Sequence, residues 1–333
     1  MPGPYIASKS KQRGSPMRTI TALFVGLGSI GTRHLKNLTN LCADRGWTLQ
    51  ADALRSDLSR PLRDGVAALL HAQYTDLADA PAHYDMVFIT NPTSLHADAL
   101  TRVRGRGGAL FIEKPIFSAE QTGLDLADCL PAGQKAYVAA PMRWCGVMLA
   151  LKDRLPGLHP YCARVICSSY LPDWRPGVDY RTVYSAHKAM GGGVTIDLIH
   201  EWDYLVELFG VPEQLYNFKG TYSDLEIDSD DLSVYIARYP TLLAEVHLDY
   251  FGRGYRRSIE IFCHDGSYLA DFGAGTLTLP DGTVQHYEED VNRRYEREME
   301  YFVDYALTGS GESCNPPALA LNVLKLTLGE NVQ

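Results

Sequence analysis

A short apolar run that ends in three closely spaced glycines constrains this chain more than any other feature. Residues Thr21–Val25 have the composition of a buried strand, and Gly26, Gly28 and Gly31 follow in the spacing G-x-G-x-x-G. In this motif the first glycine permits a tight turn and the second lets a pyrophosphate approach the backbone. The third lets the next helix pack closely on the strand. The sequence therefore predicts a dinucleotide-binding site, with Gly26, Gly28, Ser29, Ile30 and Gly31 next to the phosphates.

The first 140 residues alternate between strand-like and helix-like segments, as a parallel sheet covered by helices requires. We expect strands at 20–25, 48–54, 86–90, 109–112 and 136–140, and helices at 32–45, 60–72, 94–104 and 119–130. Ligands of such sheets bind at the carboxyl ends of the strands. This register places Asn91-Pro92 and Glu113-Lys114-Pro115 at that edge.

The second part of the chain is predicted to form a different kind of sheet, because strand-like runs follow one another with turns between them. We expect strands at 162–170, 214–222, 232–239, 244–251, 256–264, 268–272 and 276–279, and helices at 195–208, 293–308 and 317–329. The predicted fold is α/β. A doubly wound parallel Rossmann domain spans residues 17–140, and an α+β domain with a large open, mostly antiparallel sheet spans 141–333. The last helix could pack back on the first domain, and the polar residues 1–16 are predicted to be a disordered leader.

Composition excludes several classes of function. The formal charge of the 333 residues is −9, whereas a nucleic-acid-binding protein needs a basic face. No apolar run reaches the roughly 20 residues that span a bilayer. The seven cysteines are scattered without a C-x-x-C pair, which indicates reduced thiols and a cytoplasmic location. The spacing of Asp197, His200 and Asp203 does not suit a metal, and we predict none.

Lys114 is the first candidate for acid–base chemistry. It lies between Glu113 and Pro115 at the end of a buried strand, where poor solvation would lower its pKa towards the range of a catalytic acid or base. The alternative is an ordinary solvated lysine at a strand end.

Asp197 and His200 are the second candidate, because a spacing of three puts both on one face of the predicted helix. A carboxylate there could orient the imidazole and raise its pKa. Alternatively, the aspartate stabilises the helix dipole and the histidine belongs to the core.

A loop rich in aromatic and cationic residues follows the first strand of the second domain. Its arginines and lysine could hold a carboxylate or phosphate, and its aromatic rings could cover a sugar. The candidates for substrate binding are Trp174, Arg175, Tyr180, Arg181 and Lys188. The alternative is a polar surface loop.

The end of the second strand bears on the choice of cofactor. An NAD site normally has an acid there for the ribose diol. Asp52 falls near that spacing but inside the strand, and the tip carries Arg55 and Ser56. An arginine and a hydroxyl suit a 2′-phosphate, so we expect NADP rather than NAD.

Together these motifs resemble the Gfo/Idh/MocA family of glucose–fructose oxidoreductase, inositol 2-dehydrogenase and rhizopine-catabolism proteins. The resemblance covers nearly the whole chain from Met17. It rests on Gly26-Leu-Gly-Ser-Ile-Gly31, Asn91-Pro-Thr-Ser-Leu-His96, Glu113-Lys-Pro115 and Gly191-Gly-Gly-Val-Thr-Ile-Asp-Leu-Ile-His200. The resemblance implies NAD(P)-dependent hydride transfer at a hydroxyl of a sugar, sugar derivative or cyclitol. It also implies a homo-oligomer, dimer or tetramer, formed through the second sheet.

The resemblance also implies roles for individual residues. Asn91, Pro92, His96, Glu113 and Lys114 would lie at the cofactor. Lys114 matches the family's active-site lysine, His200 its proton donor or acceptor, and Asp197 the supporting carboxylate. Many members space these last two residues four apart, whereas here they are three apart. Arg143 and Trp144 fall where members contact substrate.

The stretch 173–187 resembles members found with bacterial surface-polysaccharide genes, which together with the cationic loop favours an anionic substrate, either a nucleotide sugar or a sugar acid. Two other functions stay open. One is a regulator that senses NADP or sugar on the same fold, and the other is a redox-neutral enzyme that holds its cofactor tightly.

Overall fold

A computed structural model describes residues 18–63 and 65–332, so the predicted leader at 1–16 lies outside the described residues. The chain forms two compact units, each assembled from three segments. The first unit contains the chain up to Glu113, Asp125–Ala139 and Tyr295–Pro316, and the second contains Lys114–Leu124, Ala140–Arg294 and the chain from Pro317. The boundary expected at residue 140 is therefore one of several points where the chain passes between the units.

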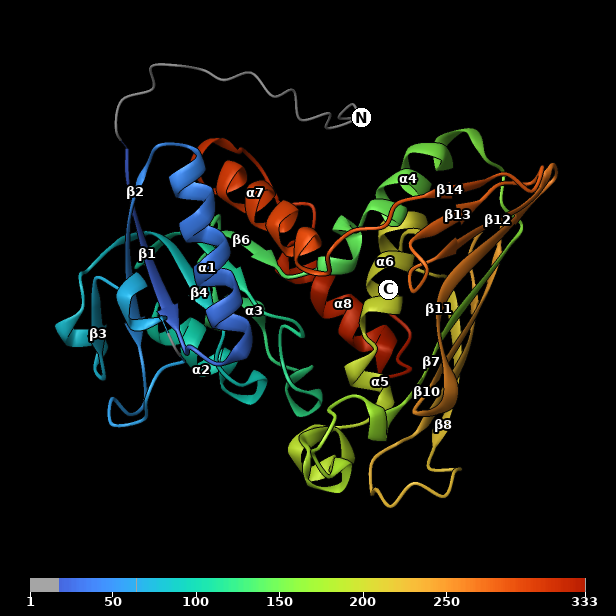
Figure 1. Cartoon of the computed structure of the whole chain (residues 1–333), viewed down its shortest axis with the longest axis horizontal. Coiled ribbons are helices and arrows are strands. Elements are labelled where there is room, and N and C mark those ends of the chain that lie inside the picture. The colour runs from blue at the N-terminus through green and yellow to red at the C-terminus, as the bar shows by residue number, and fades with distance from the viewer. Residues whose placement is uncertain (1–17, 64, 333) are drawn as a thin grey trace. The chain divides into compact units, whose positions relative to one another are not determined.

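The first unit is built on a six-stranded parallel sheet in the order β3-β2-β1-β4-β5-β6 (Figure 1). The strands are β1 (Thr19–Val25), β2 (Thr48–Leu54), β3 (Ala72–Tyr74), β4 (Tyr84–Ile89), β5 (Gly107–Ile112) and β6 (Lys135–Val138). The helices are α1 (Ser29–Asp44), α2 (His96–Arg102), α3 (Leu126–Cys129) and most of α7 (Asn292–Thr308). The predicted doubly wound sheet is confirmed, and its strand order reverses beside β1.

Two details of the first unit differ from the prediction. The helix expected over 60–72 is wrong: the described residues there form a single 3₁₀ turn, Ala67–Leu69, and the start of β3. Gly65 lies inside the predicted range and is left-handed, at φ 76°, a conformation that a helix interior does not allow. The helix expected over 119–130 is reduced to a 3₁₀ turn and α3, whose first turn is capped by the side chain of Asp125.

Stacked aromatic rings form the core of the first unit. The ring of Phe88 lies 4.4 Å from that of Phe24 and 5.3 Å from that of Phe111. Phe302 of α7 packs edge-on against Phe88 and Phe111. All four side chains are fully buried, and burial of each is worth roughly 2–3 kcal/mol. This packing fixes β1, β4 and β5, and hence the loops at their carboxyl ends.

The second unit contains an eight-stranded sheet in the order β14-β13-β12-β11-β7-β10-β9-β8. Its strands are β7 (Cys162–Tyr170), β8 (Gln214–Gly220), β9 (Leu232–Arg238), β10 (Leu243–Asp249), β11 (Phe251–Cys263), β12 (Gly266–Asp271), β13 (Thr276–Thr278) and β14 (Val284–His286). Only β7 and β10 pair in parallel, so the predicted mostly antiparallel sheet is confirmed.

Four helices cover one face of this sheet, and its other face carries no helix of the described chain (Figure 1). They are α4 (Gly146–Arg154), α5 (Val194–Asp197), α6 (His200–Phe209) and α8 (Pro317–Thr327). Along β7 the side chains of Ala163, Val165 and Cys167 are buried, whereas Arg164 between them is exposed. The sequence pattern did not reveal α4, β3 or β14. Among the described residues, no helix is both long and apolar enough to cross a bilayer.

Candidate functional site

The glycine turn after β1 has the geometry that the motif predicts. Gly26 has a φ of 87°, and a Cβ there would lie 2.8 Å from the Cα of Asn91. A Cβ on Gly31 would lie 2.7 Å from the carbonyl oxygen of Gly26 and from Oγ1 of Thr90. A Cβ on Gly28 would meet nothing within 4 Å. Gly26 and Gly31 therefore permit close packing, while Gly28 borders open space in the first unit.

Polar groups around this open space lack partners among the described residues. Helix α1 begins at Ser29 and Ile30, and no side chain caps its first turn. The Oγ1 of Thr32 and the Oδ1 of Asn91 are buried without a hydrogen-bond partner. Uncapped N–H groups and a helix N-terminus favour an anion. These residues therefore fit the pyrophosphate and neighbouring polar groups of a dinucleotide.

The loop after β4 is held by its own residues. His96, which is buried, is hydrogen-bonded through Nε2 to the carbonyl oxygen of Asn91 at 3.1 Å. The amide of Asn91 donates to the carbonyl of Leu95 at 3.3 Å, and Pro92 precedes the 3₁₀ turn that enters α2. The structure thus places Asn91 beside the glycine turn, with Pro92 and His96 shaping the loop that carries it.

Glu113 contacts a residue that sequence reasoning missed. Its Oε1 lies 2.5 Å from Nε2 of His34, a fully buried residue of α1 whose ring packs 4.6 Å from that of Phe111. Glu113 lies at the carboxyl end of β5 as expected, and its carboxylate contacts His34 of α1. A histidine three residues after Gly31 in a buried helix was the available signal.

At the tip of β2, Arg55 is half-buried and Ser56 is exposed. The guanidinium of Arg55 donates to the side chain of Gln73 at 2.8 Å and to the backbone carbonyl of Arg60. Asp52 is buried, and its carboxylate accepts a hydrogen bond of 2.8 Å from Tyr84 and contacts His71 at 3.1 Å. The carboxylate of Asp52 is therefore held in the core by these contacts. The residues at the tip of the strand are Arg55 and Ser56.

In the second unit, His200 lies among cationic side chains. The imidazole is half-buried, and burial lowers its pKa well below the usual value. Lys114, Arg257 and Arg294 lower it further, in that order. The guanidinium of Arg257 is paired with the buried carboxylate of Glu201 at 2.7 and 3.1 Å. His200 is therefore neutral near pH 7.

The predicted pairing of Asp197 with His200 is wrong. The expected single helix over 195–208 is interrupted: α5 ends at Asp197, Leu198 has φ −98° and ψ 31°, and α6 begins at His200. The two side chains share no hydrogen bond. Asp197 instead accepts hydrogen bonds from the hydroxyl groups of Tyr184 at 2.5 Å and Tyr250 at 2.6 Å.

Two of the four predicted substrate-binding cations are paired with carboxylates. Arg143 is buried and donates to Asp203 at 2.8 and 2.9 Å and to Glu207 at 2.6 Å. Arg181 is exposed and bridges Asp179 and Glu226. The expectation that both offer their charge to a ligand does not hold, because each is already neutralised. Arg175 and Lys188 are exposed, and their charged groups form no hydrogen bond or ion pair with a described residue.

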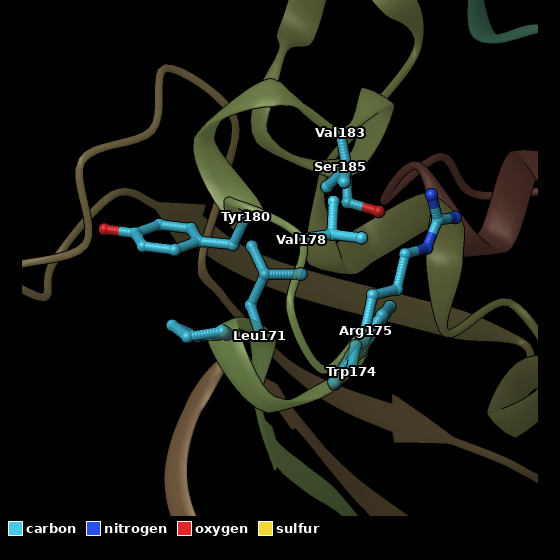
Figure 2. A pocket seen from close by; sticks show the side chains of 8 residues that line it. Leu171, Trp174, Arg175, Val178, Tyr180, Val183 and Ser185 are labelled. Atoms are coloured by element: carbon cyan, nitrogen blue, oxygen red, sulfur yellow. The ribbon is translucent and has the colours of Figure 1, made fainter.

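The aromatic residues of the loop do not form a single cluster. Trp174 is partly exposed, donates to Oγ of Ser169 at 3.1 Å and packs edge-on against Tyr250 at 5.2 Å. Figure 2 shows Tyr180 and Arg175 pointing away from one another across a hollow occupied by Leu171 and Val178. Trp144 is half-buried in the 3₁₀ turn Pro141–Trp144. The hollow is therefore largely the loop's own apolar packing.

Sequence reasoning also missed Arg257 and Arg294, which come from β11 and the start of α7. No local motif marks either residue, since only the fold brings them near His200. Among the described residues, no group of three or more His, Cys, Asp or Glu side chains could hold a metal.

Residues 20–138 match the model of the GFO_IDH_MocA family, described as an oxidoreductase family with an NAD-binding Rossmann fold. The part of the chain that contains the glycine turn therefore has the NAD-binding Rossmann fold of an oxidoreductase family. Over these residues the match agrees with the resemblance to the Gfo/Idh/MocA family that the motifs indicated. No curated protein sequence matches this chain significantly.

Solved structures extend the likeness in fold to both units. A levoglucosan dehydrogenase in complex with NADH and levoglucosan has a TM-score of 0.79 at 15% identity, over 94% of this chain and 96% of that one. The WlbA dehydrogenase from Bordetella pertussis, bound to NADH and UDP-GlcNAcA, has a TM-score of 0.72 at 19% identity, over 94% and 95%. The myo-inositol 2-dehydrogenase from Lactobacillus plantarum also scores 0.72, at 18% identity, over 93% and 96%.

Proposed function

We propose that this protein oxidises a hydroxyl group, or reduces the corresponding ketone, of a sugar or sugar derivative. The observation that carries the proposal is the neutral, half-buried imidazole of His200 in the same unit as Lys114. Lys114 directly follows Glu113, at the carboxyl edge of the sheet in which the glycine turn lies. When bound, the nicotinamide would accept or supply the hydride.

The electrostatics suggest how the two residues divide the proton chemistry. In the oxidation direction His200 takes the hydroxyl proton on its free ring nitrogen, because the surrounding cations keep it neutral. The ammonium group of Lys114 donates a hydrogen bond to the substrate oxygen and stabilises its developing negative charge. In the reduction direction the proton passes back through the imidazole to the substrate oxygen, and Lys114 keeps the same role. Asp197 holds the two tyrosines and takes no direct part.

For the dinucleotide, Gly26, Gly28, Ser29, Ile30 and Gly31 would hold the pyrophosphate. Asn91 would contact the same ligand through its unpartnered Oδ1. We propose a preference for NADP over NAD, supported by the cation and hydroxyl of Arg55 and Ser56 at the tip of β2 and by the commitment of Asp52 to the core.

We further propose an anionic substrate, either a nucleotide sugar or a sugar acid. Arg175 and Lys188 support this, since their charges are not neutralised by described residues. The WlbA dehydrogenase was solved with UDP-GlcNAcA, whereas the levoglucosan and myo-inositol enzymes are named for neutral compounds.

We propose that the protein self-associates through the second sheet, on the face that carries no helix of the described chain. Tyr216, Phe218, Ile236 and Leu243 are exposed apolar residues on the neighbouring strands β8, β9 and β10. Exposed apolar side chains grouped in this way are typical of an interface. A homo-oligomer would cover them.

The test is turnover of a panel of sugars, sugar acids and nucleotide sugars with NAD⁺ or NADP⁺, followed by absorbance of the reduced nicotinamide. We expect reduction with at least one substrate, and its loss in His200→Asn. Binding of nucleotide and sugar without turnover would instead favour the sensing regulator. Nucleotide that stays bound through purification, without net reduction, would favour the redox-neutral enzyme.

A further inference from the structure

Arg294 is a cation near His200 that lacks a charged partner. Its Nη1 donates to the thioether sulfur of Met142 at 2.8 Å, and its Nε is buried without a hydrogen-bond partner among the described residues. It forms no ion pair with a described carboxylate. A thioether is a weak acceptor, so this contact leaves the charge of the guanidinium almost uncompensated.

The other arginines in this part of the second unit are neutralised. Arg143 is held by Asp203 and Glu207, and Arg257 by Glu201. Asp197, another buried acid of this unit, accepts hydrogen bonds from two tyrosine hydroxyls. Buried charges in proteins are normally paired because their desolvation is costly. Arg294, which is partly exposed, therefore differs from these neighbours in having no ion pair with a described carboxylate.

Arg294 also reaches towards open space. It lines a cavity of the second unit together with Cys145, Phe272, Gly275 and Tyr287. Glu289, on the same cavity, accepts a hydrogen bond from the backbone N–H of Gly146 at 3.0 Å. The charge of Arg294 also acts on His200. A ligand that reached both residues would bring its anionic group to an unpaired guanidinium.

We propose that Arg294 binds a carboxylate or phosphate of the sugar substrate and thereby selects an anionic substrate over a neutral one. This inference rests on the proposed oxidoreductase function and adds a residue that the motifs did not indicate. A guanidinium can bind either anion through two parallel hydrogen bonds.

The experiment compares three probes that differ at one position: D-glucuronate, D-glucose 6-phosphate and D-glucose. Binding to the full-length protein with saturating NADP⁺ is measured by calorimetry, and kcat/KM is measured for whichever probes turn over. We expect one of the two anions to bind more tightly than glucose. Arg294→Met should weaken that anion by about 10- to 100-fold, the usual value of a charge-assisted hydrogen bond, and leave glucose unchanged.

Two further variants serve as controls. Arg294→Lys keeps the positive charge and should retain part of the affinity. Arg154→Met removes a guanidinium of the same unit that is bound to the carbonyl of Ala150 and to Gln285, and it should bind both anions as the wild type does. A preference for carboxylate or for phosphate in the wild type identifies the kind of anion.

Several outcomes would overturn the assignment. They are equal affinity of Arg294→Met and wild type for both anions, glucose binding as tight as either anion, or no binding of any probe by the wild type. If neutral sugars are oxidised equally by wild type and Arg294→Met, the oxidoreductase function stands and the role of Arg294 fails. If anions bind through Arg294 but no sugar is turned over, the binding site stands and the proposed reaction fails.

Discussion

Tyr250 donates a hydrogen bond of 2.6 Å to Asp197, the carboxylate that the motif pairs with His200. The hydroxyl of Tyr184 occupies the other carboxylate oxygen. Burial and the charge of Asp197 raise the pKa of both tyrosines, so both remain donors. Asp197 therefore anchors the 3₁₀ turn that contains Tyr184 to the sheet. Its contribution to the site is to hold this turn in place.

If this is correct, Asp197→Asn should lower stability and leave the pH profile of the enzyme unchanged. Both tyrosine hydroxyls would lose a charged acceptor, and one of them would face an amide NH₂ that cannot accept, which costs about 1–3 kcal/mol. Thermal unfolding measures the loss, and the pH dependence of kcat/KM gives the second readout. Tyr250→Phe is the matched control and should behave in the same way. A shifted pH profile with unchanged stability would show that Asp197 acts on His200 after all.

His200 should give activity a characteristic pH dependence. Its pKa lies well below 6.5, so the neutral, proton-accepting form dominates at neutral pH. The kcat/KM for oxidation should be flat near pH 7 and fall only as pH drops through that lowered pKa. Stability should also decline as pH falls below about 6.5, because the unfolded chain then binds a proton that the folded imidazole refuses. A rate that begins to fall above pH 7 would contradict this assignment.

Substitution of the two proposed acid–base residues should act on turnover and leave cofactor affinity nearly unchanged. His200→Asn and Lys114→Ala should each lower kcat by about 10²–10⁴-fold, the usual contribution of a positioned acid or base. Titration with reduced nicotinamide, followed by fluorescence, checks the cofactor. Full activity of His200→Asn on the physiological substrate would make this histidine a structural residue.

The glycine turn allows a paired test of binding against packing. Gly28→Val should abolish dinucleotide binding while the fold survives, because a Cβ there meets no protein atom within 4 Å. Gly31→Ala should instead unfold at lower temperature, because its Cβ would press on Gly26 and Thr90 at 2.7 Å. Nicotinamide fluorescence and circular dichroism separate the two effects. Normal affinity in Gly28→Val would remove the pyrophosphate from this turn.

The choice of cofactor can be tested at the tip of β2. If Arg55 binds the 2′-phosphate, Arg55→Ala should weaken NADP⁺ by about 1.5–3 kcal/mol and leave NAD⁺ nearly unchanged. Dissociation constants for both nucleotides give the comparison. Ser56→Ala should show a smaller loss in the same direction. Equal losses for the two nucleotides, or a native preference for NAD⁺, would refute the proposal for NADP.

Much of the fold followed from local patterns. The apolar runs of β1, β4 and β5 are buried on both faces, so their composition alone marks a parallel sheet. The alternation along β7 likewise marks a sheet with one covered face. The helix predicted over 60–72 is absent because Gly65, inside that range, takes a left-handed conformation. Helix α4 was missed because its polar and apolar residues are not clearly segregated along the sequence.

Local patterns also predicted only part of the candidate site. The sequence by itself determined the glycine turn and the places of Asn91, Glu113, Lys114 and His200, because each depends on backbone conformation or on the end of one element. Only the tertiary structure decided which charges are paired. The helix break at Leu198 separates Asp197 from His200, the carboxylates of α6 neutralise Arg143, and β11 and α7 bring Arg257 and Arg294 near His200. Ion pairs and desolvation depend on distances between segments far apart in the chain, which no local pattern encodes.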